Sequence, residues 1–159
     1  MKKINFTASR LVVRLSQQRD PEGWAFSLCD FIAAYTRSHL VCYYRFQGKG
    51  AAVQTGMKLA AKIGLPAVPQ KFSTESSVFQ LAMENGKAVV QTEENGPFGG
   101  ILLDGAMRSG VALYVQSSGD QGGLLIANHS APFHYDAEFI SVLEQFAELV
   151  SCYRGGIDG

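Results

Sequence analysis

Apolar and polar residues recur with helical spacing over residues 7–38. We predict a short amphipathic helix over 7–19 and a second helix over 21–38. The second helix has a clear start, because Asp20 can accept a hydrogen bond from a free backbone N–H and Pro21 suits the first helical position. The apolar positions that define the first helix are Leu11, Val12 and Leu15.

The pattern changes after the second helix to β-branched and aromatic residues. Segment 40–56 predicts a hairpin of two strands. Segment 57–63 fits either a helical turn or an extension of a strand, because Pro66 and Pro69 force an irregular loop soon afterwards. This part of the chain therefore has two interpretations.

A third helix is predicted in the middle of the chain. Ser73 or Thr74 can cap its start, and Gly86 is suited to ending it. A short strand over 88–91 follows directly. Residues 92–109 show no sustained periodicity and are predicted to form a mobile connection, a kind of segment that is often functional.

The strongest strand pattern lies between residues 110 and 130. Two apolar strands are joined there by a polar turn over 117–122. A last amphipathic helix follows over 136–154 and ends at a pair of glycines. Adjacent antiparallel strands, with helices at both ends of the chain, predict an α+β domain built on one sheet.

Composition narrows the class of protein. The chain has 159 residues, 47% of them hydrophobic and 18% charged, and its formal net charge is zero. This size fits one domain with a core that needs no disulfide or metal to fold. The 14 Lys and Arg residues are spread along the chain without a basic stripe, which argues against direct nucleic-acid contact.

The cysteines and the N-terminus indicate a compartment. Cys29, Cys42 and Cys152 are odd in number and widely spaced, so they predict neither a disulfide framework nor a zinc knuckle. The first residues lack the apolar run of a signal peptide, and no apolar run approaches the length of a membrane span. We expect a cytoplasmic chain that makes no membrane contact.

One long stretch carries a family resemblance. Residues 108–151, RSGVALYVQSSGDQGGLLIANHSAPFHYDAEFISVLEQFAELVS, combine an apolar strand, a polar turn, a Gly-led strand and an acidic helix start before LxxFAxxV. This order resembles the GAF family of small-molecule sensor domains, and the likeness extends over about 21–153. The resemblance implies a central antiparallel sheet with the terminal helices on one face. A ligand pocket, roofed by the middle segment, is implied on the other face.

The resemblance also implies an organisation and a partner. It divides the chain into an N-terminal helix over 1–20 that is a candidate dimerisation segment, a GAF-like domain over 21–154 and a linker or tail over 155–159. GAF domains of bacterial signalling proteins often form homodimers through their terminal helices. The alternative is that the apolar stripes of these helices pack against their own chain, because a stripe alone does not distinguish the two.

The segment between the last strand and the last helix contains the densest group of metal-ligand residue types. A zinc site would need three or four of these side chains to converge at about 2 Å. We instead expect His129 to end the strand, and Asp136 and Glu138 to cap the helix and offset its dipole. His134 lies between these two elements, and no metal is expected.

Cysteine chemistry is an alternative that the resemblance raises. The GAF family includes free methionine-R-sulfoxide reductases, which use cysteines in the pocket. A catalytic thiolate needs an exposed, electropositive setting. Cys29 and Cys42 instead fall in a core-like helix and an apolar strand, and Cys152 ends the last helix. We therefore predict no catalysis and no cofactor, since the Cys-His pair of covalent chromophore sites is missing too.

Candidate ligand contacts come from strand residues that face away from the terminal helices and from the middle segment. Pockets are mostly apolar with a few placed polar groups. Arg108 is the cation placed to hold an anionic ligand. The complete set is Tyr44, Phe79, Met83, Phe98, Met107, Arg108 and Tyr114.

Three functions follow from the sequence. The first is a non-catalytic sensory domain that binds a small molecule or a partner and signals through its terminal helices. The second is a cysteine-dependent reductase. The third is a dimerisation module whose pocket is filled by its own side chains.

Overall fold

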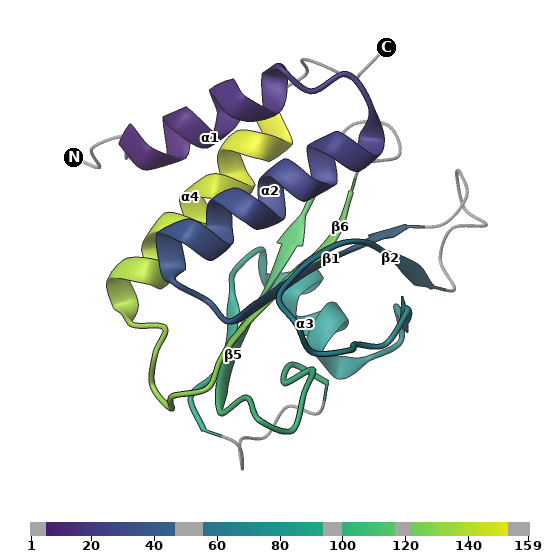
Figure 1. Ribbon diagram of the computed structural model, residues 1–159, viewed down its shortest axis with the longest axis vertical. Coiled ribbons are helices and arrows are strands. Elements are labelled where there is room, and N and C mark those ends of the chain that lie inside the picture. Colours follow the sequence, from purple (N-terminus) through teal and green to yellow (C-terminus); the bar gives the residue numbers. More distant parts are fainter. Residues whose placement is uncertain (1–5, 47–55, 94–99, 117–121, 153–159) are drawn as a thin grey trace.

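One antiparallel sheet organises the chain (Figure 1). The computed structural model describes residues 6–46, 56–93, 100–116 and 122–152. Within these ranges the sheet has six strands in the order β3-β2-β1-β6-β5-β4. Pairing of β6 with β1 on one side and with β5 on the other places the last strand at the centre of the sheet. The strands are β1 Leu40–Phe46, β2 Met57–Ile63, β3 Lys71–Phe72, β4 Val89–Gln91, β5 Ser109–Val115 and β6 Gly123–His129.

Helices cover both faces of the sheet unequally. Figure 1 shows α1 (Phe6–Ser16), α2 (Pro21–Thr36) and α4 (Ala137–Cys152) together on one face, and α3 (Ser77–Asn85) on the other. This confirms the α+β class and the predicted position of the terminal helices. Among the described helices, none combines the length and the apolar character that crossing a membrane requires.

The core beneath the three helices includes the first helix. Leu11 and Leu15 on α1 are 0% and 1% exposed and pack with residues of α2, α4 and the sheet. At about 25 cal/mol per Å² of apolar surface, burying two leucines stabilises the fold by roughly 3 to 6 kcal/mol before entropy is counted. These two side chains therefore pack against their own chain. Val13, which is 58% exposed, presents apolar surface on the outside of α1.

The ends of the helices follow local hydrogen bonding. Asp20 accepts the N–H of Gly23 at 2.6 Å and starts α2 as predicted. The helix ends at Thr36 rather than at residue 38, because Arg37 takes a left-handed conformation with φ of 55° and caps it. For α3 the cap is Ser76, whereas Ser73 accepts the N–H of Glu75 in the turn before the helix.

The predicted hairpin is displaced along the sequence. The partner of β1 is β2, with Phe46 opposite Met57 and Val41 opposite Ile63, so the ambiguous segment 57–63 is a strand. The predicted hairpin placed its second strand before residue 57. Residue 56 is not part of a strand, and residues 47–55 lie outside the described ranges. Pairing with β1 and burial against α2 settle a pattern that local propensity leaves open. The two-residue strand β3, which pairs with β2, was not predicted.

Candidate functional site

The sheet face opposite the three helices holds the candidate site. Side chains alternate along the strands, so Cys42, Tyr44, Leu124 and Ile126 point to this face while Tyr43 points to the helices. Together with α3 and residues 101–107 they form a second apolar cluster, which is separate from the core under the helices. The apolar side chains on this face come mainly from the middle of the chain and from strand positions.

Three aromatic rings meet at one end of this face. Phe46 of β1, Phe79 of α3 and Tyr114 of β5 contact one another in pairs, with ring centroids 5.8 to 6.4 Å apart. The interplanar angles of 67° to 90° are edge-to-face arrangements, which aromatic rings favour. We call these three residues the aromatic triad. It joins a central strand, a near-edge strand and the helix on this face.

Tyr44 links the sheet to the loop that precedes β3. Its hydroxyl donates to the carbonyl oxygen of Pro69 at 2.8 Å, and its ring lies 5.3 Å from that of Phe72. Burial raises the pKa of Tyr44 well above its usual range. The phenol is therefore a neutral donor that fixes the loop.

The roof of the site is held by one buried amide. Asn128 of β6 is 0% exposed; its Oδ1 accepts the N–H of Leu103 at 2.7 Å and its Nδ2 donates to the carbonyl oxygen of Ile101 at 2.9 Å. Gly110 makes room for this contact, because a Cβ there would lie 2.7 Å from both Asn128 Nδ2 and Ile101 Cγ2. We call residues 101–103 the roof segment. Asn128 was not among the predicted site residues, although an amide within the apolar run LLIANH was a signal.

The structure brings four of the seven predicted contact residues into this cluster. Tyr44, Phe79 and Met107 are buried in it, and the partly buried Tyr114 packs against it. Met83 is 40% exposed and lies outside the cluster.

Two further predicted contact residues, Arg108 and Phe98, are not among the described residues of this cluster. The side chain of Arg108 is exposed, while its backbone N–H donates to the carbonyl oxygen of His129. Phe98 lies outside the described residues. Their role as ligand contacts stays a prediction, as it does for the four that gather.

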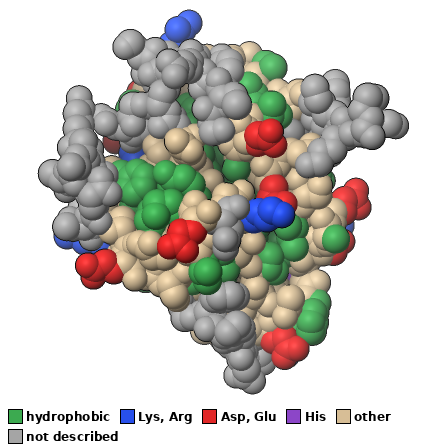
Figure 2. Space-filling view, turned by 180° about the vertical axis from the view of Figure 1, so that it is seen from behind, with side chains coloured by type: hydrophobic (Ala, Val, Ile, Leu, Met, Phe, Trp, Pro, Cys, Tyr) green, Lys and Arg blue, Asp and Glu red, His purple; other side chains and the backbone are tan. Residues whose placement is uncertain are grey.

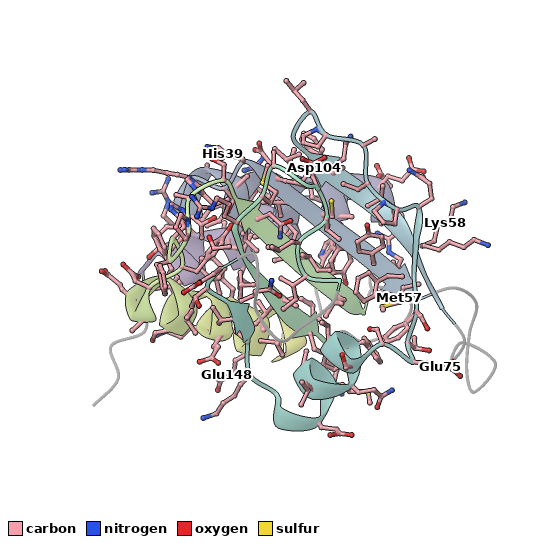
Figure 3. All side chains as sticks on the ribbon, turned by 90° about the horizontal axis from the view of Figure 1, so that it is seen from below. His39, Met57, Lys58, Glu75, Asp104 and Glu148 are labelled. Carbon is pink, nitrogen blue, oxygen red and sulfur yellow. The ribbon has the colours of Figure 1, made fainter. Side chains whose placement is uncertain are left out.

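A cleft opens beside the aromatic triad at the edge of the sheet. Its volume is about 340 Å³. Glu144 of α4 also accepts the N–H of Ala88 at 3.0 Å, which ties the helix to the start of β4. In Figure 3, Glu148 lies on α4 on the side where α3 is found. The cleft is lined by Gly86, Lys87, Tyr114, Gln116, Glu144, Ala147 and Glu148.

The surface on the side opposite to the view of Figure 1 carries both apolar and charged side chains. Figure 2 shows apolar side chains in several groups, with individual acidic and basic side chains between them. The described part of this face therefore offers apolar contact with scattered charges rather than a field of one sign.

Neither described thiol is set up as a nucleophile. Cys29 on α2 and Cys42 on β1 are both buried and belong to the clusters on opposite faces of the sheet. Burial raises the pKa of Cys29 well above its usual range and that of Cys42 to about 12. Both thiols therefore stay protonated at neutral pH. The side chain of Cys152 lies outside the described residues.

The segment between β6 and α4 has the structural role predicted for its carboxylates. Asp136 accepts the N–H of Phe139 at 2.9 Å and so caps α4. The rings of His129 and His134 are stacked 3.6 Å apart at 9°. Lone pairs lie in the plane of each imidazole, so two parallel rings cannot both point at one ion. Among the described residues no group of three or more His, Cys, Asp or Glu side chains is arranged to hold a metal.

Six antiparallel strands in this order, flanked by helices in this way, are the architecture of the GAF fold. No model of a protein family matches the sequence, and no curated protein matches it. Solved structures do match, as follows, and they confirm the resemblance inferred from residues 108–151 at the level of the fold.

The free methionine-R-sulfoxide reductase of Neisseria meningitidis, solved with its substrate, is 16% identical with a TM-score of 0.73 over 91% of this chain and 84% of that one. A protein of Burkholderia vietnamiensis classed as a GAF sensor is 17% identical with a TM-score of 0.72 over 92% and 89%. The GAF domain of an Acinetobacter phosphoenolpyruvate-protein phosphotransferase is 15% identical with a TM-score of 0.69 over 95% and 92%. The neighbours thus include sensor domains as well as enzymes.

Proposed function

We propose that this chain is a non-catalytic sensory or regulatory GAF-like domain that binds a small molecule and signals through its terminal helices. The observation that carries the proposal is the position of Tyr114. This residue belongs to the aromatic triad and also lines the cleft that α4 closes with Glu144, Ala147 and Glu148. A ligand in this cleft would therefore lie against both Tyr114 and a terminal helix.

The lining of the cleft suggests the chemical class of the ligand. Tyr114 and Ala147 offer apolar surface, whereas Lys87, Gln116 and Glu144 offer polar groups of both signs. Such a lining suits a small amphipathic molecule that carries hydrogen-bond donors and a charge. Partial burial raises the pKa of Tyr114, so its hydroxyl is a neutral hydrogen-bonding group at physiological pH.

The proposal is tested by locating ligand-induced changes in the purified chain. Amide spectra are recorded while mixtures of small amphipathic metabolites are added, and native mass spectrometry reports any molecule retained from expression. We expect shifts at Gly86, Lys87 and Gln116 that extend into α4. Shifts confined to surface residues far from the cleft would contradict the proposal. A dimer that retains nothing and responds to no mixture would favour a dimerisation module instead.

The reductase alternative rests on the fold neighbours that carry this activity. The buried, protonated thiols of Cys29 and Cys42 argue against it. Turnover of free methionine-R-sulfoxide is therefore expected to be absent. Activity that disappears in Cys42→Ser, while Cys29→Ser keeps it, would establish the enzyme and overturn the sensor proposal.

The terminal helices are also the proposed route to a second copy of the chain. Leu11 and Leu15 are occupied inside the chain, so the surface left for a homodimer includes Val13 on α1 and Phe26 on α2, which are 58% and 49% exposed. A sedimentation experiment with Val13→Lys and Phe26→Lys separately tests this. A dimer of the parent chain that neither substitution weakens would exclude this surface.

A further inference from the structure

The three histidines of the chain lie in a single stack. The sequence contains three histidines, and the ring of His129 lies 4.0 Å from that of His39 and 3.6 Å from that of His134. His39 immediately precedes β1, His129 ends β6 and His134 lies in the turn before α4. Figure 3 shows His39 at the same end of the molecule as Asp104, which follows the roof segment. The stack therefore joins the start of β1 to the turn between β6 and α4.

Each ring also makes a hydrogen bond to the backbone. Nδ1 of His39 accepts the N–H of Ser130 at 3.2 Å, and Nδ1 of His129 accepts the N–H of Ala131 at 2.9 Å. Nε2 of His134 lies 2.6 Å from the carbonyl oxygen of Thr36, and because a carbonyl only accepts, this nitrogen carries the proton. Two consecutive N–H groups of the turn thus depend on imidazole acceptors.

An imidazole accepts a hydrogen bond only when it is neutral. Protonation of His39 or His129 at Nδ1 would turn the acceptor into a donor that faces another N–H. The hydrogen bond to Ser130 or Ala131 would then be lost. A second proton in the stack would also place like charges in adjacent rings, which opposes it.

Other polar groups around the stack leave this dependence in place. His134 donates through Nε2 and can do so in either charge state, and its ring is perpendicular to the Tyr135 ring at 5.0 Å. Asp136 is engaged at the cap of α4, and Arg108 meets His129 through its backbone.

The same neighbours account for the titration of the central ring. The pKa of His129 is lowered from 6.5 to about 4 by burial first and then by the charges of His134 and His39. His129 therefore stays neutral, and able to accept a hydrogen bond, until the pH falls to about 4.

We propose that the His39–His129–His134 stack is an acid-sensitive latch on the turn that joins β6 to α4. In the neutral state it fixes Ser130 and Ala131. Protonation releases them and loosens the turn, which is also attached through the hydroxyl of Ser109 to the carbonyl oxygen of Ala131 and through the N–H of Phe133 to the carbonyl oxygen of Thr92. The restraint at the start of α4, a terminal helix, is relaxed in consequence. This response needs no ligand, so it goes beyond the sensory function proposed above.

The latch is tested by nuclear magnetic resonance of the imidazole nitrogens and the backbone amides between pH 7.5 and pH 3.5. We expect His39 and His129 as the Nε2–H tautomer at neutral pH. The amide of Ala131, whose acceptor is His129, should shift, and exchange at least about tenfold faster, as His129 titrates. Leu113 of β5, fully paired with β6, is the internal control and should stay protected. Simultaneous exchange at Leu113 would mean global unfolding and would overturn the proposal.

Two variants complete the test. His129→Asn keeps an acceptor for the N–H two residues on, since Asn forms such turns with its own backbone, but it does not titrate. Its Ala131 amide should remain protected in acid. His134→Gln removes one neighbouring charge and should raise the midpoint of His129 by about half a pH unit, a readout that does not require the first variant to fold. Equal acid release in His129→Asn, or an unchanged midpoint in His134→Gln, would refute the latch.

Discussion

Replacing Asn128 by alanine removes the amide that holds the roof segment. The side chain is fully buried and bonds Leu103 N–H at 2.7 Å, Ile101 O at 2.9 Å and Ala127 O at 2.9 Å. The backbone pairing of β6 with β1 does not involve the amide, so the sheet should survive the substitution. Asn128→Ala therefore isolates the attachment of the roof.

The cost can be worked from the groups left behind. A buried donor or acceptor without a partner costs about 1 to 3 kcal/mol. Ile101 is fully buried, whereas Leu103 is half-buried, so the penalty at Leu103 should be the smaller of the two. We expect Asn128→Ala to lower the free energy of unfolding by about 2 to 4 kcal/mol, out of the roughly 5 to 15 kcal/mol typical of a domain.

Urea unfolding followed by circular dichroism measures this change, and a thermal scan should show a melting temperature lower by roughly 5 to 15 °C. Gly110→Ala forces the same contact apart and should cost about 1 to 3 kcal/mol. The double variant should lose less than the sum of the two, because both substitutions act on one contact.

Gln70→Ala is the matched control, since it removes an exposed side-chain amide and should change stability by no more than about 0.5 kcal/mol. The reasoning is refuted if Asn128→Ala is no more costly than Gln70→Ala. Asn128→Asp separates donor from packing, because it keeps an acceptor for Leu103 but cannot donate to Ile101. It should therefore be at least as destabilising as alanine at neutral pH.

Three further predictions concern other sites. The pKa of His129 falls from 6.5 unfolded to about 4 folded, so its contribution is complete above pH 6.5 and is lost as the pH falls toward 4. After allowance for solvent screening this amounts to about 1 to 2 kcal/mol. Urea unfolding at a series of pH values should show a steeper fall of the free energy of unfolding with decreasing pH in the parent than in His129→Asn. Arg37→Gly should stabilise the fold by about 0.5 to 1 kcal/mol because Arg37 is exposed with φ of 55°, whereas a loss of stability would contradict the cap. In Cys152→Ser protein, Cys29 and Cys42 should react with a thiol reagent at pH 8 at least about 100-fold more slowly than a free thiol, and reaction at the free-thiol rate would show that they are not buried.

The elements that the sequence predicted well are those with strong local signals. Asp20 and Gly86 cap their helices as expected, because an acceptor at the first position and a left-handed residue at the last are local properties. The strands β5 and β6 were predicted for the same reason, since their apolar runs are bounded by a polar turn. Segment 57–63 was ambiguous because its strand conformation depends on pairing with β1.

The site was predicted in part for a related reason. Tyr44 and Tyr114 were identified by strand alternation, and the sheet does bring them to one face. Met83 was predicted as a ligand contact together with Phe79, but α3 is short and only part of its apolar side reaches the sheet. Phe46 and Asn128 were missed because their importance lies in contacts with distant segments, the aromatic triad and the roof segment.

The end of β6 connects the two faces of the sheet through adjacent residues. Because side chains alternate along a strand, Asn128 faces the roof segment while His129 faces the turn that leads to α4. Arg108, just before β5, is hydrogen-bonded to the backbone of His129, so the connection between the roof segment and β5 is fixed at the same point. Asn128, which holds the roof segment, is therefore the neighbour in sequence of His129, which lies in the histidine stack. Displacement of the roof segment and protonation of the stack would therefore act on the same strand end, next to the turn that leads to α4.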